Sequence, residues 1–102
     1  MTSKMKVATV DEIAPGRMKG VVVEGKKVLI ANLDGSFYAT GSVCTHVGGP
    51  LDKGRLEGHV ITCPWHGSQF DITSGKALRG PAVNPEPTYK VCVEGNDVIL
   101  EV

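Results

Sequence analysis

The sequence predicts a single all-β domain built from antiparallel sheets. Thirteen glycines and six prolines separate many short runs rich in Val and Ile, a pattern typical of short strands joined by turns. No segment keeps a helical period over ten or more residues. A length of 102 residues suits one domain and is too short for two ordinary ones.

The N-terminal part is expected to form a meander of strands. Residues 18–24 and 27–33 are predicted strands joined at Glu24-Gly25-Lys26. Asp34-Gly35 is a strong turn dipeptide, and a third strand at residues 37–39 is expected to follow it. Before this meander, residues 11–13 are expected to form one short helical turn, which Pro15-Gly16 ends.

The C-terminal part is expected to form a final hairpin. Residues 88–94 and 97–102 are predicted strands around Gly95-Asn96. In the first of them, apolar residues at positions 89, 91 and 93 alternate with polar or less apolar ones, as in a half-buried strand. Pro81, Pro85 and Pro87 indicate an extended connector before it.

The middle of the chain differs from both flanks. Residues 41–80 hold two of the three cysteines, all three histidines, the single Trp and most of the glycines. We therefore expect a small binding lobe at about 41–80, inserted in a β-sheet base formed by about 4–40 and 81–102.

Composition excludes several classes of function. Eleven basic and eleven acidic residues give a net charge of zero, with no basic run to bind nucleic acid. The longest apolar runs, residues 21–23 and 28–31, are far short of a membrane span, and no secretory signal is evident. We expect a cytoplasmic protein with no membrane anchor. An odd number of cysteines then favours metal ligation over a disulfide framework.

Two short loops carry the ligand pattern. Cys44-Thr45-His46 is separated by sixteen residues from Cys63-Pro64-Trp65-His66, so each loop offers one thiolate and one imidazole. The residues between them, including 55–57 and 59–62, are enough for a hairpin that folds the loops together. Two centres fit this donor set. A tetrahedral zinc ion would take all four ligands, and a [2Fe–2S] cluster would take both cysteines on one iron and both histidines on the other.

The residues that surround the candidate ligands in both loops resemble those of a known family. Residues 44–51, CTHVGGPL, and residues 63–71, CPWHGSQFD, are similar to the two cluster-binding boxes of Rieske proteins, and the likeness extends over essentially the whole chain. It implies a Rieske-like fold of stacked antiparallel sheets with a small inserted cluster-binding lobe, and one [2Fe–2S] cluster. By this resemblance Cys44 and Cys63 bind the inner iron, whereas His46 and His66 bind the outer iron near solvent.

The resemblance also narrows the kind of Rieske protein. Respiratory-type members have two further cysteines that brace the loops, but here Gly48 or Gly49 and Trp65 occupy the expected positions. An oxygenase needs a second domain for which this chain has no room. The remaining fit is a ferredoxin, expected to be a monomeric, non-enzymatic carrier with no small-molecule substrate. It would pass single electrons from a flavin-containing reductase to a terminal oxygenase or other oxidoreductase. A small subunit of nitrite reductase is the alternative.

Two positions bear on the reduction potential. Ser68 matches a serine that in high-potential relatives donates a hydrogen bond to a bridging sulfide, whereas Phe70 stands where those relatives have a tyrosine that donates to a cysteine sulfur. Because hydrogen bonds to the sulfurs raise the potential, the absence of the tyrosine predicts a value in the lower part of the Rieske range.

Three other residues have weaker assignments. Trp65 is expected either to shield the cluster from water or to form part of a partner-docking surface. His59 lies outside both boxes and is expected to have a surface or hairpin role. Cys92 is expected to be an incidental residue of the last hairpin.

Overall fold

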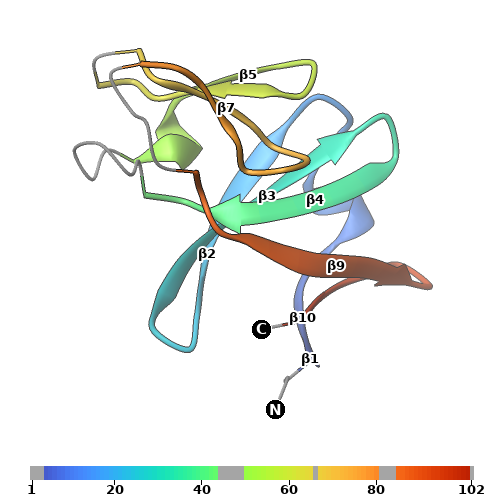
Figure 1. The fold of residues 1–102 in the computed structure, drawn as a ribbon. Helices are drawn as coiled ribbons and strands as arrows, with labels where there is room; N and C mark the ends of the chain where they lie inside the picture. Colours follow the sequence, from blue (N-terminus) through green and yellow to red (C-terminus); the bar gives the residue numbers. More distant parts are fainter. Residues whose placement is uncertain (1–3, 44–49, 66, 81–84, 102) are drawn as a thin grey trace.

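A computed structural model describes residues 4–43, 50–65, 67–80 and 85–101. These residues form ten β-strands and two single-turn 3₁₀ helices, and every strand pairing is antiparallel, which confirms the all-β prediction. The strands make a six-stranded sheet and a four-stranded sheet, which lies above strands β3 and β4 in the view of Figure 1. Within this part of the chain, neither helix is long and apolar enough to cross a membrane.

The six-stranded sheet, here called the base sheet, has the order β1-β10-β9-β4-β3-β2. Its strands are β1 (Lys4–Thr9), β2 (Met18–Val23), β3 (Lys26–Leu33), β4 (Ser36–Gly41), β9 (Thr88–Glu94) and β10 (Asp97–Glu101). The four-stranded sheet, here called the lobe sheet, consists of β5 (Arg55–Glu57), β6 (Val60–Thr62), β7 (Gln69–Asp71) and β8 (Ala77–Arg79), paired in that order. The 3₁₀ turns are η1 (Val10–Glu12) and η2 (Leu51–Lys53).

The predicted meander is confirmed as β2, β3 and β4. Two-residue loops join these strands, and both residues of each loop have positive φ: 50° and 78° at Glu24 and Gly25, and 52° and 94° at Asp34 and Gly35. Left-handed backbone at both central positions gives a hairpin turn whose twist matches that of its strands. The helical turn η1 was predicted one residue too late.

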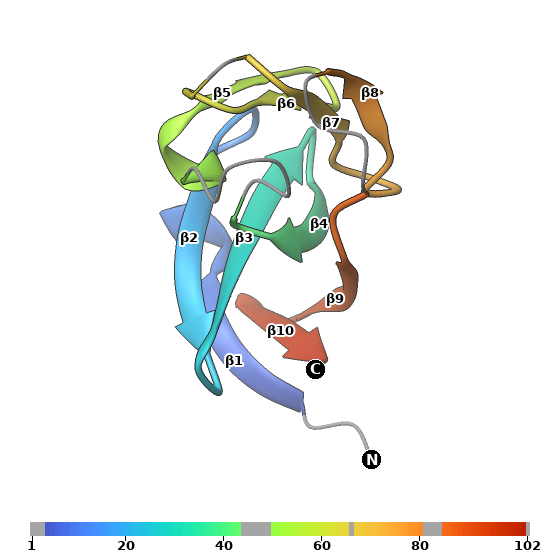
Figure 2. The same ribbon diagram turned by 60° about the vertical axis from the view of Figure 1, so that its left-hand side comes forward.

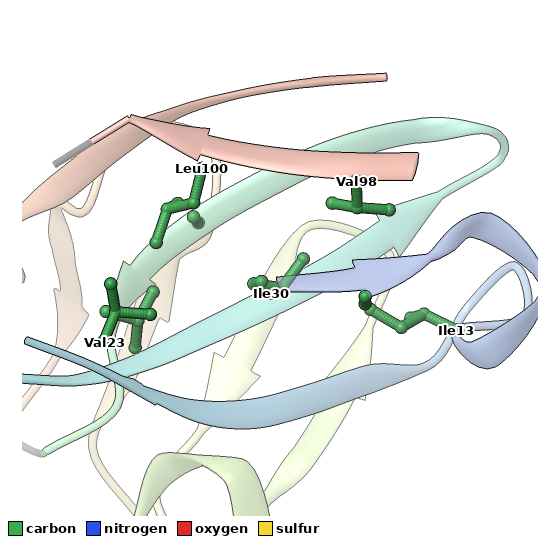
Figure 3. Packing of buried hydrophobic residues seen from close by; sticks show 8 residues of the cluster. Ile13, Val23, Ile30, Val98 and Leu100 are labelled. Atoms are coloured by element: carbon green, nitrogen blue, oxygen red, sulfur yellow. The ribbon is translucent and has the colours of Figure 1, made fainter. Parts of the chain in front are cut away.

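Strand β3 is buried on both faces and joins two cores. Val28 and Ile30 point into the core of the base sheet, whereas Leu29 and Ala31 point toward the lobe sheet, and all four have no exposed surface. Successive side chains of a strand face opposite ways, so a continuous apolar run serves both cores. Figure 3 shows Val98 and Leu100 of β10 packed over Ile30 of β3 in the base core.

The lobe sheet sits over the other face of β3 (Figure 2). The β5–β6 hairpin was expected from residues 55–62, but β7 and β8 were not predicted. The core beneath this sheet, here called the lobe core, combines apolar residues of β3, η2, β6 and β7, and the residue that follows β7, with one cysteine. Its buried members are Leu29, Ala31, Leu51, Ile61, Cys63, Phe70 and Ile72.

The predicted final hairpin is confirmed as β9 and β10. Tyr89 and Val91 are half-buried against the base core, but Val93 is 44% exposed, so the expected burial fails at the end of β9. Strand β9 pairs with β4 only through Tyr89 opposite Ala39 and Thr88 opposite Thr40, and then diverges from it (Figure 1). Residues 85–87 form no regular element, as expected of a connector; Pro81 lies outside the described residues.

Candidate metal centre

The base of the first predicted ligand loop is closed by backbone pairing. Val43 and Pro50 form an isolated antiparallel bridge, and the Leu51 N–H donates to the Ser42 carbonyl oxygen at 2.8 Å. Residues 44–49 between them, including the predicted ligands Cys44 and His46, lie outside the described residues. The chain therefore leaves β4 and returns to η2 at one place.

The second loop is closed in the same way. The Cys63 N–H donates to the Ser68 carbonyl oxygen at 2.7 Å, and Gly67 takes a positive φ of 76°, a left-handed conformation that favours glycine. Cys63 is only 1% exposed, whereas Trp65, two residues further on, is 50% exposed. The predicted ligand His66 lies outside the described residues. The loop thus passes from the core to the surface within two residues.

Packing brings the two loops to the same end of the lobe. Leu51, just after the first loop, shares the lobe core with Cys63, the first residue of the second. Close backbone approach supports this contact, since a Cβ on Gly54 would lie 2.0 Å from the Thr62 carbonyl oxygen. Glycine at position 54 therefore lets the chain after η2 run against the end of β6.

These features fit an iron–sulfur cluster. Two thiolates and two imidazoles are the donor set of a Rieske centre, and the structure places Cys63 in the apolar lobe core. Among the described residues no three Cys, His, Asp or Glu side chains gather into a metal site. Three of the four predicted ligands are not among those residues.

The two positions that bear on the potential are both buried. Ser68 and Phe70 have no exposed surface. Phe70 lies in the lobe core with Cys63, and it is the largest of the fully buried side chains described. The sequence marked Phe70 as a missing hydrogen-bond donor, and its packing role was missed.

His59 and Cys92 lie at the surface. His59 is in the β5–β6 turn, its side chain 60% exposed, with Nδ1 3.4 Å from Asp71 Oδ1. Burial raises the pKa of Asp71, but hydrogen bonds from the Thr73 hydroxyl and N–H, with His59 beside it, lower that pKa more, so the net shift is downward. Cys92 is exposed on β9, with Sγ 3.9 Å from Glu94 Oε2.

Two carboxylates near the first loop were not foreseen. Glu86 is 4% exposed, and its Oε1 would lie 2.8 Å from a Cβ on Gly41, the last residue of β4. Asp52 in η2 accepts a hydrogen bond from the Ser42 hydroxyl at 3.1 Å. The flanking Pro85 and Pro87 gave no sign that Glu86 would be buried. Nothing in the sequence around Asp52 distinguishes it from the other charged residues nearby.

Comparison with known proteins decides between zinc and iron–sulfur. Residues 3–90 match the Rieske [2Fe-2S] domain family. The chain belongs to that family and carries its [2Fe–2S] cluster. Within the family the likeness is to ferredoxins. The chain is 40% identical over 91 residues to the ferredoxin component of the naphthalene 1,2-dioxygenase system of Pseudomonas aeruginosa, covering 89% of this chain and 88% of that one.

Solved structures agree with this placement. The ferredoxin of carbazole 1,9a-dioxygenase from Nocardioides aromaticivorans IC177 is 31% identical, with a TM-score of 0.93 over 96% of both chains. A chain from a complex of reduced oxygenase and oxidised ferredoxin in carbazole 1,9a-dioxygenase is 31% identical, with a TM-score of 0.91, covering 95% of this chain and 91% of that one. The similarity therefore supports an electron-carrier function, because these relatives are ferredoxins of dioxygenase systems.

The nitrite-reductase alternative receives less support. A putative NADH-dependent nitrite reductase small subunit from Mycobacterium tuberculosis has a TM-score of 0.88 but only 24% identity, over 100% of this chain and 96% of that one. At that identity the likeness concerns the fold alone.

Proposed function

We propose that this protein carries single electrons from a flavin-containing reductase to a terminal oxygenase. Cys44 and Cys63 hold the inner iron of the cluster, and His46 and His66 hold the outer one. Residues 41–80 form the cluster-binding subdomain on a base of residues 4–40 and 81–102. The protein works as a cytoplasmic monomer and transforms no small-molecule substrate.

The observation that carries this proposal is the change in burial along the second loop. Cys63 is buried in the lobe core, and Trp65 is half exposed. A cluster attached to this loop has apolar protein on its inner side and lies close to the molecular surface on its outer side. The cluster supplies a one-electron couple, and the protein supplies a short route between that couple and a partner.

Ser68 and Trp65 have separate tasks in this proposal. Ser68 is fully buried directly after the loop, where its hydroxyl donates to a cluster sulfur and stabilises the added negative charge. Trp65 offers a large exposed apolar face beside the ligands, the kind of side chain that anchors protein interfaces. We assign Trp65 to partner docking.

Stopped-flow electron transfer tests the proposal. Reduced protein is mixed with the oxidised oxygenase of a naphthalene dioxygenase system, and oxidised protein is mixed with the matching reduced flavin reductase. We expect one electron per chain to pass in each experiment, and a Cys63→Ser variant to pass none. A protein that dithionite reduces but that exchanges electrons with neither partner contradicts the proposal.

A matched pair of variants tests the role of Trp65. Trp65→Ala is expected to slow the second-order reaction with the oxygenase while leaving the reduction potential unchanged. Val93→Ala is the control, because Val93 is a comparably exposed apolar residue, 44% exposed, on the base strand β9. If Trp65→Ala changes the potential and the rate follows the driving force, Trp65 shields the cluster and does not dock the partner.

A further inference from the structure

A side-chain hydrogen bond ties together the two ends of the first ligand loop. Ser42 lies just before the loop, Asp52 lies just after it, and the Ser42 hydroxyl donates to Asp52 Oδ1 at 3.1 Å. The Leu51 N–H donates to the Ser42 carbonyl oxygen in parallel, at 2.8 Å. Both the backbone and the side chain of Ser42 are thus hydrogen-bonded to η2, so two hydrogen bonds close the base of the loop.

The same carboxylate lies against the base sheet. A Cβ on Gly20 of β2 would come within 2.6 Å of Asp52 Oδ2 and 2.8 Å of its carboxyl carbon. Gly20 has no positive φ, so its backbone does not require glycine. The missing side chain at position 20 instead leaves room for the Asp52 carboxylate. The carboxylate therefore rests on β2 while it holds Ser42.

The surroundings strengthen this contact. Ser42 is 3% exposed and Asp52 is half-buried, so the bond is partly shielded from water. A hydrogen bond to an ionised carboxylate is stronger than one between neutral groups, and partial burial reduces its competition with water. Lys27 and Lys53 line the same surface groove as Asp52.

We propose that Asp52 is a positioning residue for the cluster. Through Ser42 and over Gly20 it fixes the stem of the first loop to strand β2, and so holds Cys44 and His46 in the arrangement that binds the irons. This inference rests on the proposed assignment of those two residues as ligands. Asp52 is not one of the four predicted ligands, but by this proposal it controls how firmly the protein retains its cluster.

Chelator challenge of the purified holoprotein tests the proposal. The bleaching rate of the visible chromophore is measured with excess EDTA for Asp52→Ala, Ser42→Ala and Gly20→Ala. Each is expected to lose the cluster about tenfold faster than wild type, the low end of the change expected from loss of one hydrogen bond to a charged group. The double Ser42→Ala, Asp52→Ala variant is expected to be no faster than either single variant, because both remove one contact.

Two further variants separate positioning from charge. Asp52→Asn keeps an oxygen that can accept the Ser42 hydroxyl and is expected to restore most of the retention. Glu57→Gln removes an exposed lobe carboxylate whose Oε1 lies 3.6 Å from Arg55 Nη1, and is expected to bleach at the wild-type rate. The reduced forms of Asp52→Ala and Ser42→Ala are also expected to show shifted or broadened EPR signals, because the iron ligands are less well fixed.

Wild-type bleaching rates and EPR signals in Ser42→Ala and Asp52→Ala would overturn the inference. Additive effects of the two substitutions, or a loss in Asp52→Asn equal to that in Asp52→Ala, would also overturn it. If the Cys44→Ala variant retains its cluster as the wild-type protein does, the result contradicts the assignment of Cys44 as a ligand and not the role of Asp52. If Asp52→Ala is isolated without cluster, Ser42→Ala and Gly20→Ala, which keep the carboxylate, decide the question.

Discussion

The base sheet and the lobe sheet are both antiparallel, but they are specified in different ways. Base strands are five to eight residues long, two-residue turns close the β2–β3, β3–β4 and β9–β10 hairpins, and the strands surround an aliphatic core. Lobe strands have three residues each, too few for a stable sheet on their own. They depend on Phe70 in the lobe core, on close backbone contacts at glycines, and on β3, which both cores share.

The difference teaches where function can be placed in a small domain. Long strands paired over most of their length give the base a regular framework. The lobe accepts irregular loops and a buried cysteine because the base supplies a rigid face beneath it. We therefore expect substitutions in the lobe core to affect the cluster, and equally severe substitutions in the core of the base sheet to affect stability alone.

Truncating a large buried side chain in each region gives the largest expected contrast. Phe70→Ala in the lobe is expected to cost about 3–5 kcal/mol of unfolding free energy, and Leu100→Ala in the base about 2–5 kcal/mol; both side chains are fully buried. Denaturant unfolding measures both costs. Cluster loss below the unfolding midpoint is expected only for Phe70→Ala, and premature loss in Leu100→Ala would remove the distinction.

Adding a methyl group at a glycine gives the next contrast. Gly54→Ala places Cβ 2.0 Å from a backbone oxygen of Thr62, and overpacking of this kind costs about 1–3 kcal/mol. Gly25→Ala in the base turn meets nothing within 4 Å and carries only the cost of its positive φ, about 1–2 kcal/mol. Cluster content distinguishes them: Gly54→Ala is expected to reduce it and Gly25→Ala to preserve it.

A hydroxyl in the lobe core is expected to act on the cluster and not on the fold. Phe70→Tyr offers a donor in the core that contains Cys63, and a hydrogen bond of about 1 kcal/mol to the reduced centre corresponds to about 40 mV for one electron. We expect the potential to rise by about this amount in a spectroelectrochemical titration. An unchanged or lower potential with an intact cluster would refute this role of position 70.

Acid stability provides the smallest contrast, and it compares Glu12 of the base with Asp71 of the lobe, two carboxyls whose pKa is lowered. In the base, hydrogen bonds from Lys19, and from the N–H and hydroxyl of Thr9, hold the pKa of Glu12 at about 2. In the lobe, burial opposes the shift, but the Thr73 bonds and His59 lower the pKa of Asp71. Each carboxylate stabilises the fold above its unfolded-state pKa, and this contribution is lost as the pH falls through the folded-state value.

Unfolding between pH 6 and pH 2 measures this dependence. Glu12→Gln and Asp71→Asn are each expected to flatten the decline in stability at low pH. The Glu12 effect is expected to be slight, since its side chain is solvent-exposed. If neither substitution alters the slope, these two carboxylates are not the source of acid sensitivity.

The sequence predicted the base better than the lobe for physical reasons. Short runs rich in Val and Ile, together with turn residues such as Asp34-Gly35 and Gly95-Asn96, are local signals, and they located β2, β3, β4, β9 and β10. Strands β7 and β8 are three residues long, and Gly54 and Gly75 matter only because carbonyl oxygens from distant parts of the chain approach them. Such contacts leave no local pattern.

The candidate site divides in the same manner. The types and order of its metal ligands could be predicted because each loop contains a cysteine followed closely by a histidine in the sequence. Membership of the Rieske family supports the cluster that these ligands imply. The contact of Asp52 with Ser42 and Gly20 could not be predicted, because it joins three elements separated in sequence. The burial of Cys63 beside an exposed Trp65 likewise follows from tertiary packing alone.

Pulsed EPR of the dithionite-reduced protein tests the central claim most directly, because it detects nitrogen nuclei bound to the paramagnetic iron pair. The account predicts strong couplings to two histidine nitrogens, with one of them lost in His46→Cys and the other in His66→Cys. A reduced cluster with no coupled nitrogen, or with both couplings retained in either variant, would contradict the assignment of one Cys–His pair to each loop.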